Sequence, residues 1–356
     1  MKKKILILSD VNSAHTEKWV CALLANNFEI YLFSLRKSKT TWYENLSDFQ
    51  YSIQEKNNST SLTSKLIYFK AVPKIKQIIK TFKPDFVHAH YASSYGLLGA
   101  LSGFTPFYIS VWGSDVYDFP QKSIVTELAL KYVFKKASKI FSTGDVMAEE
   151  IGKYTDKKIE IVSFGVDVNK FQPIKQGKVS KCIQIGVIKS LEYIYGIDIL
   201  IKAISEVVQS HQNVRLRIVG GGRLLSEYKQ MVLDLNLSEY VVFVGKVPYD
   251  RVVEEYQKLD VFVNPSRFES FGVSILEASS CGLPVIATRA GGQVELVNEN
   301  ETGLLVEPES AAKLADAMNQ LINEEDVRVN MGFKGREFVV RNYTLKSSIL
   351  SMVSHY

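Results

Sequence analysis

Short apolar runs alternate with longer segments of helical spacing along most of the chain. The runs are rich in Val, Ile and Leu, as expected for strands buried on both faces of a parallel sheet. The predicted strands of the first half are Ile5–Leu8, Glu29–Phe33, Phe86–His90, Phe107–Val111, Ile140–Ser142 and Glu160–Val162. Those of the second half are Lys181–Ile185, Arg215–Val219, Val241–Val244, Val261–Asn264, Pro284–Ala287 and Leu304–Val306. This alternation predicts an α/β protein with parallel sheets.

The alternation of apolar runs and helical segments is interrupted around residues 165–180, which are polar and include glycine and proline. A chain of 356 residues is also too long for one typical core. We therefore predict a Rossmann-like domain at 1–168, a linker at 169–180 and a second Rossmann-like domain at 181–335. A C-terminal helix at 336–356 is a candidate to pack back on the first domain. Two such doubly wound sheets would face each other across a cleft at the carboxyl ends of their strands.

Hydropathy and cysteine content favour a cytoplasmic protein. No apolar stretch approaches the roughly 20 residues of a membrane-spanning helix. The first apolar run, Ile5–Leu8, is too short for the core of a signal peptide. The three cysteines, Cys21, Cys182 and Cys281, are scattered and lack metal-ligand spacing, which fits a reducing compartment.

Charge is spread unevenly along the chain. Residues 1–174 hold 23 Lys/Arg and 16 Asp/Glu, a net charge of +7, whereas residues 175–356 hold 20 and 22, a net charge of −2. Residues 62–83, with apolar spacing interrupted at Pro73, carry six lysines and no acid, and residues 131–139 form a second basic cluster. Two interpretations stay open: solvated surface helices, or faces that rest on anionic lipid and reach a lipid-linked acceptor. Nucleic acid is not expected as a partner, because no recognition motif accompanies the charge.

The segment Pro265–Glu295 carries the most informative chemical pattern. Glu269 and Glu277 stand eight residues apart, separated by a turn at 270–273 that opens a predicted helix. A helix start presents free backbone N–H groups and the positive end of the helix dipole, which suit a phosphate. Glu277 lies inside that helix, where it can accept hydrogen bonds from sugar hydroxyls. An anion site flanked by two carboxylates is what a nucleotide sugar requires.

Together with the strand-like run 261–264 before it and the glycines at 291–292 after it, this segment resembles the E-x7-E signature of retaining glycosyltransferases of family GT4. The resemblance implies the GT-B fold and a nucleotide diphosphate sugar held by the second domain. It implies that Glu269 is a catalytic residue facing the donor sugar and that Glu277 binds the ribose. It places further donor contacts at Ser270, Phe271, Gly272, Val273, Gly245, Lys246 and Val247.

The chain departs from the family where the departing diphosphate must be stabilised. Many sugar transferases use a metal ion held by an Asp-x-Asp pair, but no two aspartates here are two residues apart. We expect no metal or cofactor, and fixed cations with helix ends must then stabilise the charge. Lys189 stands near the position of a family arginine, and Arg223 is a second candidate cation. A family lysine before Gly196 is replaced by Ile194 or Tyr195, which leaves open a donor-binding but inactive homologue.

Two histidines mark the catalytic side of the first domain. His88 and His90 lie on one face of a predicted strand, near its carboxyl end. A structural role is one interpretation; the resemblance implies instead that His90 is a catalytic residue near the donor sugar. Zinc is not expected, because the chain has only five histidines and no cysteine near these two. The acceptor or loop candidates are Asn12, His15 and Asp115.

The implied reaction is transfer of a sugar from a UDP- or GDP-sugar to an acceptor hydroxyl with retained anomeric configuration. The resemblance places it in bacterial surface polysaccharide or glycolipid assembly, such as lipopolysaccharide or capsule, in the cytoplasm or peripherally on the inner face of the membrane. A GT-B-fold nucleotide-sugar epimerase is an open alternative. A dinucleotide-dependent oxidoreductase is disfavoured, because Leu225 stands where a third glycine should follow Gly220 and Gly222.

Overall fold

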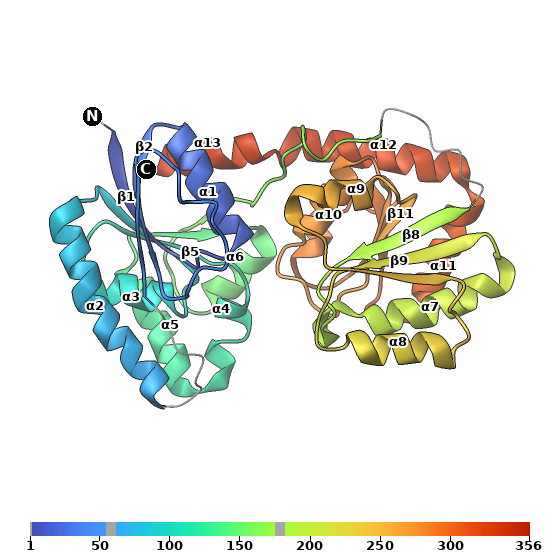
Figure 1. Cartoon of the computed structure of the whole chain (residues 1–356), viewed down its shortest axis with the longest axis horizontal. Helices are drawn as coiled ribbons and strands as arrows, with labels where there is room; N and C mark the ends of the chain where they lie inside the picture. The colour runs from blue at the N-terminus through green and yellow to red at the C-terminus, as the bar shows by residue number, and fades with distance from the viewer. Residues whose placement is uncertain (1, 55–61, 175–181) are drawn as a thin grey trace. The chain divides into compact units, whose positions relative to one another are not determined.

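The computed structural model describes residues 2–54, 62–174 and 182–356 (Figure 1). The chain forms two compact units, residues 1–163 together with 349–356, and residues 164–348. Residues 169–174 of the predicted linker belong to the second unit, and residues 175–180 lie outside the described residues. The predicted C-terminal helix corresponds to two helices, α12 (Glu325–Asn342) and α13 (Leu345–His355), and the chain enters the first unit again at Ile349.

The first unit is built on a seven-stranded parallel sheet with the order β3-β2-β1-β4-β5-β6-β7. The order reverses between β1 and β4, and open α/β sheets bind ligands outside the carboxyl ends of their strands at such a switch point. In the β1–β4 register Ile7 pairs with His88. The strands are β1 (Lys3–Leu8), β2 (Phe28–Ser34), β3 (Phe49–Ile53), β4 (Phe86–His90), β5 (Phe107–Ser110), β6 (Lys139–Ser142) and β7 (Ile159–Ile161).

The second unit has a six-stranded parallel sheet with the order β10-β9-β8-β11-β12-β13. Its switch point lies between β8 and β11. The strands are β8 (Ile183–Ile188), β9 (Val214–Val219), β10 (Val241–Gly245), β11 (Val261–Asn264), β12 (Val285–Thr288) and β13 (Gly303–Val306).

Helices cover both faces of each sheet (Figure 1). In the first unit α2, α3, α5 and α6 share a core with residues of β1, β4 and β5, including Leu6, Leu8 and Phe107. In the second unit α7, α8 and α11 share a core with β8 and β9. The remaining helices are α1 (Ala14–Ala25), α2 (Leu62–Phe82), α3 (Tyr95–Ser102), α4 (Ser114–Tyr117), α5 (Ile124–Lys136), α6 (Asp145–Gly152), α7 (Ile197–Ser210), α8 (Leu225–Asp234), α9 (Val252–Tyr256), α10 (Val273–Ser280) and α11 (Ala311–Asn323).

The predicted fold class of two doubly wound parallel α/β sheets is confirmed, and every predicted strand has a counterpart. Strand β3 was not predicted, because it lies at the sheet edge and exposes Gln50 and Tyr51, so it lacks a continuous apolar run. The expected interruption at Pro73 is wrong, since α2 continues through that residue. Within the described residues, no helix combines the length and apolar character needed to cross a bilayer.

Candidate active site

Glu269 lies beyond the carboxyl end of β11, at the switch point of the second sheet. On the neighbouring strand Lys189 follows β8 directly, and its amide donates to the Val219 carbonyl at 3.0 Å. The two side chains form an ion pair in which only 11% of Lys189 and 13% of Glu269 is exposed. The Lys189 ammonium also lies 4.9 Å from the ring centroid of Tyr195. The structure therefore brings together the predicted catalytic carboxylate and the predicted diphosphate cation.

Glycines after β12 hold the Glu269 backbone in place. Gly291 has a φ of +66°, and a Cβ there would lie 2.0 Å from the Glu269 carbonyl oxygen. The Gly292 amide donates to that oxygen at 2.8 Å. A Cβ on Gly292 would lie 2.5 Å from the Ser270 carbonyl oxygen. Two backbone segments thus approach at a distance that only glycine permits.

Arg267 ties the same loop to the start of α7. Its guanidinium donates to both carboxylate oxygens of Asp198, at 2.8 and 2.7 Å, and to the Tyr193 carbonyl at 2.7 Å. It also pairs with Glu309 and lies 3.8 Å from the centroid of the Tyr193 ring. A bidentate Arg–carboxylate pair fixes orientation as well as position. Because these partners occupy Arg267, we assign it to holding the loop rather than to binding a diphosphate.

A buried polar network lies behind the loop. The Asn264 amide donates to Gln293 at 3.0 Å, and the Ser266 hydroxyl donates to Asn264 at 2.9 Å. The Gln293 amide donates to Thr288 at 2.6 Å, and the Thr288 hydroxyl donates to the Ser266 carbonyl. All four side chains are buried. Fully satisfied networks of this kind rigidify the segments that they join, here the loops after β11 and β12.

The helix after this loop, α10, begins at Val273. Its N-cap, Gly272, has a φ of +109° and provides no side-chain cap. Phe271 is buried and packs edge-on against Phe164 at a centroid distance of 5.9 Å. The buried Ser274 hydroxyl, in the first turn, has no hydrogen-bond partner among the described residues. Since the first N–H groups of a helix lack intrahelical partners, this end of α10 can receive an anion.

Glu277 is buried within α10, and its carboxylate accepts two tyrosine hydroxyls. Tyr249 donates to Oε1 and Tyr256 donates to Oε2, each at 2.9 Å. Tyr256 is fully buried, and burial together with the Glu277 carboxylate raises the pKa of its hydroxyl. The two tyrosines therefore fix the orientation of the Glu277 carboxylate inside the helix.

The other predicted donor contacts lie on neighbouring strand ends. Gly245 ends the edge strand β10 with a φ of +84°, and its carbonyl accepts the Gly220 amide at 2.8 Å. Lys246 is exposed, and Val247 is partly buried. Arg223 is 88% exposed and pairs with Glu192 at 2.8 Å. Unlike Lys189, Arg223 is therefore not held against Glu269.

In the first unit His88 and His90 project from β4, with ring centroids 5.0 Å apart. Both are buried. His90 Nδ1 lies 3.0 Å from the Ser9 hydroxyl, and its ring stacks on Trp112 at a centroid distance of 4.4 Å. His88 Nε2 lies 2.8 Å from the Ser110 hydroxyl, and its Nδ1 contacts the hydroxyl of Tyr356. The His88 ring is therefore fixed from both sides, beside the ring of the predicted catalytic residue.

The acceptor or loop candidates have distinct environments. The Asn12 side chain donates to the Lys37 carbonyl at 3.0 Å and accepts the Lys39 amide at 2.6 Å, so it joins the loops after β1 and β2. The His15 ring packs edge-on against Trp112 at 5.6 Å. Asp115 is buried and is not the helix N-cap, which is Gly113. Its carboxylate accepts backbone amides of Ala92, Trp112 and Gly113, which fixes the loops after β4 and β5.

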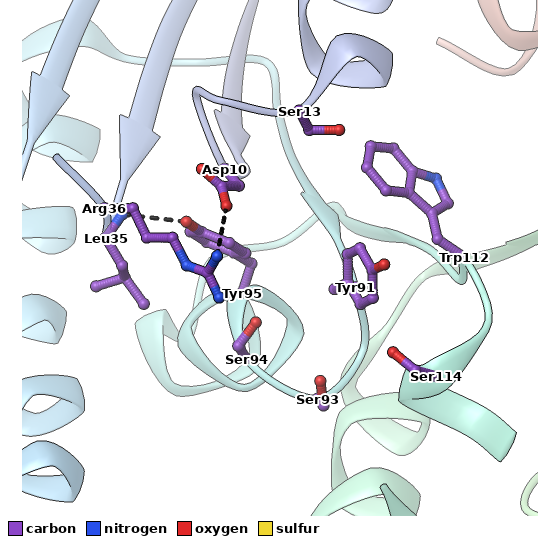
Figure 2. Close-up of a pocket in the computed structure, with 10 residues that line it drawn as sticks. All are labelled: Asp10, Ser13, Leu35, Arg36, Tyr91, Ser93, Ser94, Tyr95, Trp112 and Ser114. Carbon is purple, nitrogen blue, oxygen red and sulfur yellow. Dashed lines mark hydrogen bonds and ion pairs between the residues drawn. The ribbon is translucent and has the colours of Figure 1, made fainter. Parts of the chain in front are cut away.

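A pocket of about 390 Å³ opens at the carboxyl edge of the first sheet (Figure 2). Arg36 reaches toward Asp10 on one side, where the two side chains form an ion pair at 3.3 Å. Aromatic rings and serine hydroxyls form much of the remaining lining. The residues are Asp10, Ser13, Leu35, Arg36, Tyr91, Ser93, Ser94, Tyr95, Trp112 and Ser114. Such a mixture of ring faces and hydroxyls suits a polyhydroxylated ligand.

The buried histidines predict that acid destabilises the first unit. Burial lowers the pKa of His88 to about 3 and that of His90 well below its ordinary value. Below a pH of about 6.5 these histidines are protonated in the unfolded chain but stay neutral in the folded protein. The free energy of unfolding therefore falls as the pH is lowered. Burial also lowers the pKa of His15, in the same unit, to about 3. Burial raises the pKa of Asp115 to about 6, which has the opposite sign but involves one group against these three histidines. We expect a net loss on the order of 4 kcal/mol between pH 7 and pH 5.

Tryptophan fluorescence can measure this loss in the first unit alone, because all three tryptophans, Trp19, Trp42 and Trp112, belong to it. Urea unfolding followed at pH 7 and pH 5 should show a lower midpoint at pH 5. An unchanged or higher midpoint at pH 5 would contradict burial of neutral histidines beside β1.

Several residues that shape the site were not predicted from sequence. Arg267 lies two residues before Glu269, but its partners Asp198 and Glu309 are distant in the chain. The tyrosines that hold Glu277 are likewise separated from it in sequence. Within the described ranges, no group of three or more His, Cys, Asp or Glu side chains is arranged to hold a metal ion.

Two family models match the chain. Residues 168–338 match the model of group 1 glycosyl transferases, and residues 4–144 match the glycosyl transferase 4-like model. The uncharacterized glycosyltransferase MJ1178 from Methanocaldococcus jannaschii is 30% identical over 74% of this chain and 72% of its own length. The GDP-mannose-dependent alpha-(1-6)-phosphatidylinositol monomannoside mannosyltransferase of Mycobacterium tuberculosis is 32% identical over 52% of each chain, so this chain matches about half of its length.

The fold has solved counterparts. Sucrose-phosphate synthase from Thermosynechococcus elongatus aligns with a TM-score of 0.85 and 19% identity, covering 100% of this chain and 98% of that one. At this identity the likeness concerns the fold alone, which is GT-B. Both family models, the MJ1178 match and the fold agree on one assignment. The chain belongs to the group 1, GT4-type glycosyl transferases and is a glycosyltransferase of the GT-B fold.

Proposed function

We propose that this glycosyltransferase moves a sugar from a nucleoside diphosphate sugar to an acceptor hydroxyl with retention of anomeric configuration. The observation that carries the proposal is the Glu269–Lys189 pair, held at the switch point beside the start of α10. Here a carboxylate, a cation and helix N–H groups converge on one strand edge. Sugar hydroxyls are natural partners of the carboxylate, and a diphosphate is the natural partner of the cation and of the helix N–H groups.

The departing diphosphate gains negative charge, and we assign its stabilisation to Lys189 and the first turn of α10. Both are held in position before substrate arrives, so little reorganisation is needed during reaction. The Ser274 hydroxyl, which has no hydrogen-bond partner in the part of the chain that the structure describes, can donate a further hydrogen bond there. Lys189 now neutralises Glu269, and a bound diphosphate would share that cation. This arrangement supplies positive charge without a metal ion.

Glu277 is proposed to bind the ribose hydroxyls of the donor. Tyr249 and Tyr256 orient the carboxylate, and a carboxylate is a natural hydrogen-bond acceptor for ribose hydroxyls. Glu277→Gln should therefore weaken donor binding, raising KM for the nucleotide sugar about tenfold or more while kcat changes less. Steady-state kinetics with varied donor concentration would measure the change. An unchanged donor KM would place the ribose elsewhere.

The acceptor is proposed to be a sugar or a lipid-linked glycan that enters the pocket of the first unit. Tyr91 and Trp112 offer ring faces, while Asp10 and the serine hydroxyls offer hydrogen-bond partners. The names of the relatives point to similar chemistry, since one transfers mannose to a phosphatidylinositol mannoside. We place the reaction in bacterial surface polysaccharide or glycolipid assembly at the inner face of the membrane.

A thermal-shift screen of UDP- and GDP-sugars would identify the donor, because a ligand that binds only the folded state raises Tm. The proposal expects at least one nucleotide sugar to raise Tm in the wild type and to do so less in Glu277→Gln. Incubation of that donor with candidate acceptors, followed by NMR of the product's anomeric proton, would then establish the stereochemistry. Conversion of the donor to an isomer without acceptor would instead indicate an epimerase.

A further inference from the structure

The outer face of α5 exposes four large apolar side chains. Ile124 is 66% exposed, Val125 70%, Leu128 58% and Tyr132 36%. They are four of the seven exposed large apolar side chains in the described part of the first unit, the others being Tyr51, Ile161 and Leu350. Ile124, Leu128 and Tyr132 follow the i, i+4 spacing that forms one row along a helix. The opposite side of α5 packs in the core, so this apolar row is additional to the face that folding requires.

Lysines surround the apolar row. Lys136 continues it by one further turn, and its ammonium lies 5.8 Å from the ring centroid of Tyr132. Lys122, Lys131 and Lys135 are also exposed. The one acid within α5, Glu127, pairs with Lys131 at 2.6 Å. The helix therefore combines exposed apolar side chains with a net positive charge.

Helix α2 extends this charge over the same layer. Both α2 and α5 pack against α3, and all three share the core on one face of the sheet (Figure 1). The sequence of α2 contains no acid. Among the lysines of α2 whose side chains the structure describes, the exposed ones are Lys70, Lys74, Lys76 and Lys80. A broad basic surface thus accompanies the apolar row.

We propose that α5 docks the protein on an anionic bilayer, with Ile124, Val125 and Leu128 entering the interface and the lysines contacting lipid phosphates. Apolar residues inserted beside basic ones are the ordinary composition of interfacial helices. A second copy of this chain is a poorer occupant, because it would bring two lysine-rich surfaces together. An anionic membrane satisfies both the apolar row and the spread of charge over two helices. This inference does not rest on the donor chemistry.

Co-sedimentation of the full chain with vesicles tests the proposal. Binding to vesicles of mixed phosphatidylglycerol and phosphatidylcholine should exceed binding to phosphatidylcholine alone and should weaken as salt is raised. The triple variant Ile124→Ser/Val125→Ser/Leu128→Ser should lower the partition coefficient about tenfold or more. The matched control is Val329→Ser/Phe333→Ser, which changes exposed apolar residues of α12 in the second unit and should bind as the wild type does. Every replaced side chain is exposed, so folding should be retained.

A second pair of variants tests the contribution of the lysines to membrane binding. Lys135→Ala/Lys136→Ala should reduce binding to anionic vesicles and flatten its salt dependence, whereas Lys229→Ala/Lys334→Ala, in the second unit, should do neither. Equal binding of the triple variant and the wild type would overturn the proposal, as would equal binding to neutral and anionic vesicles. Loss of a concentration-dependent dimer in the triple variant, without any lipid binding, would assign the surface to a second copy instead. None of these three results depends on whether sugar transfer is observed.

Discussion

Glu269→Gln should lower kcat/KM for sugar transfer by about 10²–10³, equivalent to about 3–4 kcal/mol of transition-state stabilisation. Glutamine has nearly the same shape, so the loop held by Gly291, Gly292 and Arg267 should keep its conformation. The change removes a negative charge that Lys189 now neutralises and that we expect to stabilise the reacting sugar. Nucleoside diphosphate binding should persist, because the start of α10 and Glu277 are untouched.

Steady-state kinetics and titration calorimetry with the nucleoside diphosphate would separate these two effects. The control is Glu239→Gln, which alters an exposed carboxylate of the same unit and should leave both quantities unchanged. Wild-type transfer by Glu269→Gln would remove Glu269 from the reaction. Equal loss of transfer and of nucleotide binding would instead indicate that the residue serves only to shape the site.

His90→Gln should lower kcat about 10²-fold with a smaller effect on donor KM. The nucleotide is assigned to the second unit, whereas His90 belongs to the first unit, where it stacks on Trp112 and contacts Ser9. A loss of kcat at nearly constant donor KM is therefore expected if the imidazole contacts the sugar during reaction. Single-turnover kinetics would confirm that chemistry, rather than product release, has slowed.

Because His90 is buried, its replacement can also reduce stability. Urea unfolding followed by tryptophan fluorescence would show whether the first unit of His90→Gln is folded under assay conditions. His211→Gln, at the end of α7 in the second unit, is the matched control and should retain full activity. Full activity of a folded His90→Gln variant would leave this histidine with a structural role alone.

The alternation of apolar runs predicted the two sheets because strands buried on both faces must be continuously apolar. The edge strand β3 was not predicted, because its exposed residues Gln50 and Tyr51 interrupt the apolar run. The E-x7-E segment likewise located Glu269, Glu277 and the start of α10, because all three are close together in sequence. Features formed by residues that are close together in the sequence could therefore be predicted from local sequence patterns.

The supports of the site could not be predicted in this way. Arg267 meets Asp198 and Glu309 only after three strand ends are brought to one edge. The contact of Tyr356 with His88 joins residues 268 positions apart. Position 291 requires glycine because the Glu269 carbonyl oxygen lies too close for a Cβ, and this contact is visible only in the folded structure. Such contacts are set by tertiary packing, and no sequence spacing encodes them.

We infer that the loop from Glu269 into α10 receives the diphosphate of an activated sugar. Hydrogen-exchange mass spectrometry of the wild type, with and without the nucleoside diphosphate identified by thermal shift, tests it most directly. We expect slower exchange in peptides spanning residues 266–277, because bound phosphate oxygens would accept hydrogen bonds from the N–H groups of the first turn. Protection confined to other segments, with exchange at 266–277 unchanged by saturating nucleotide, would contradict it.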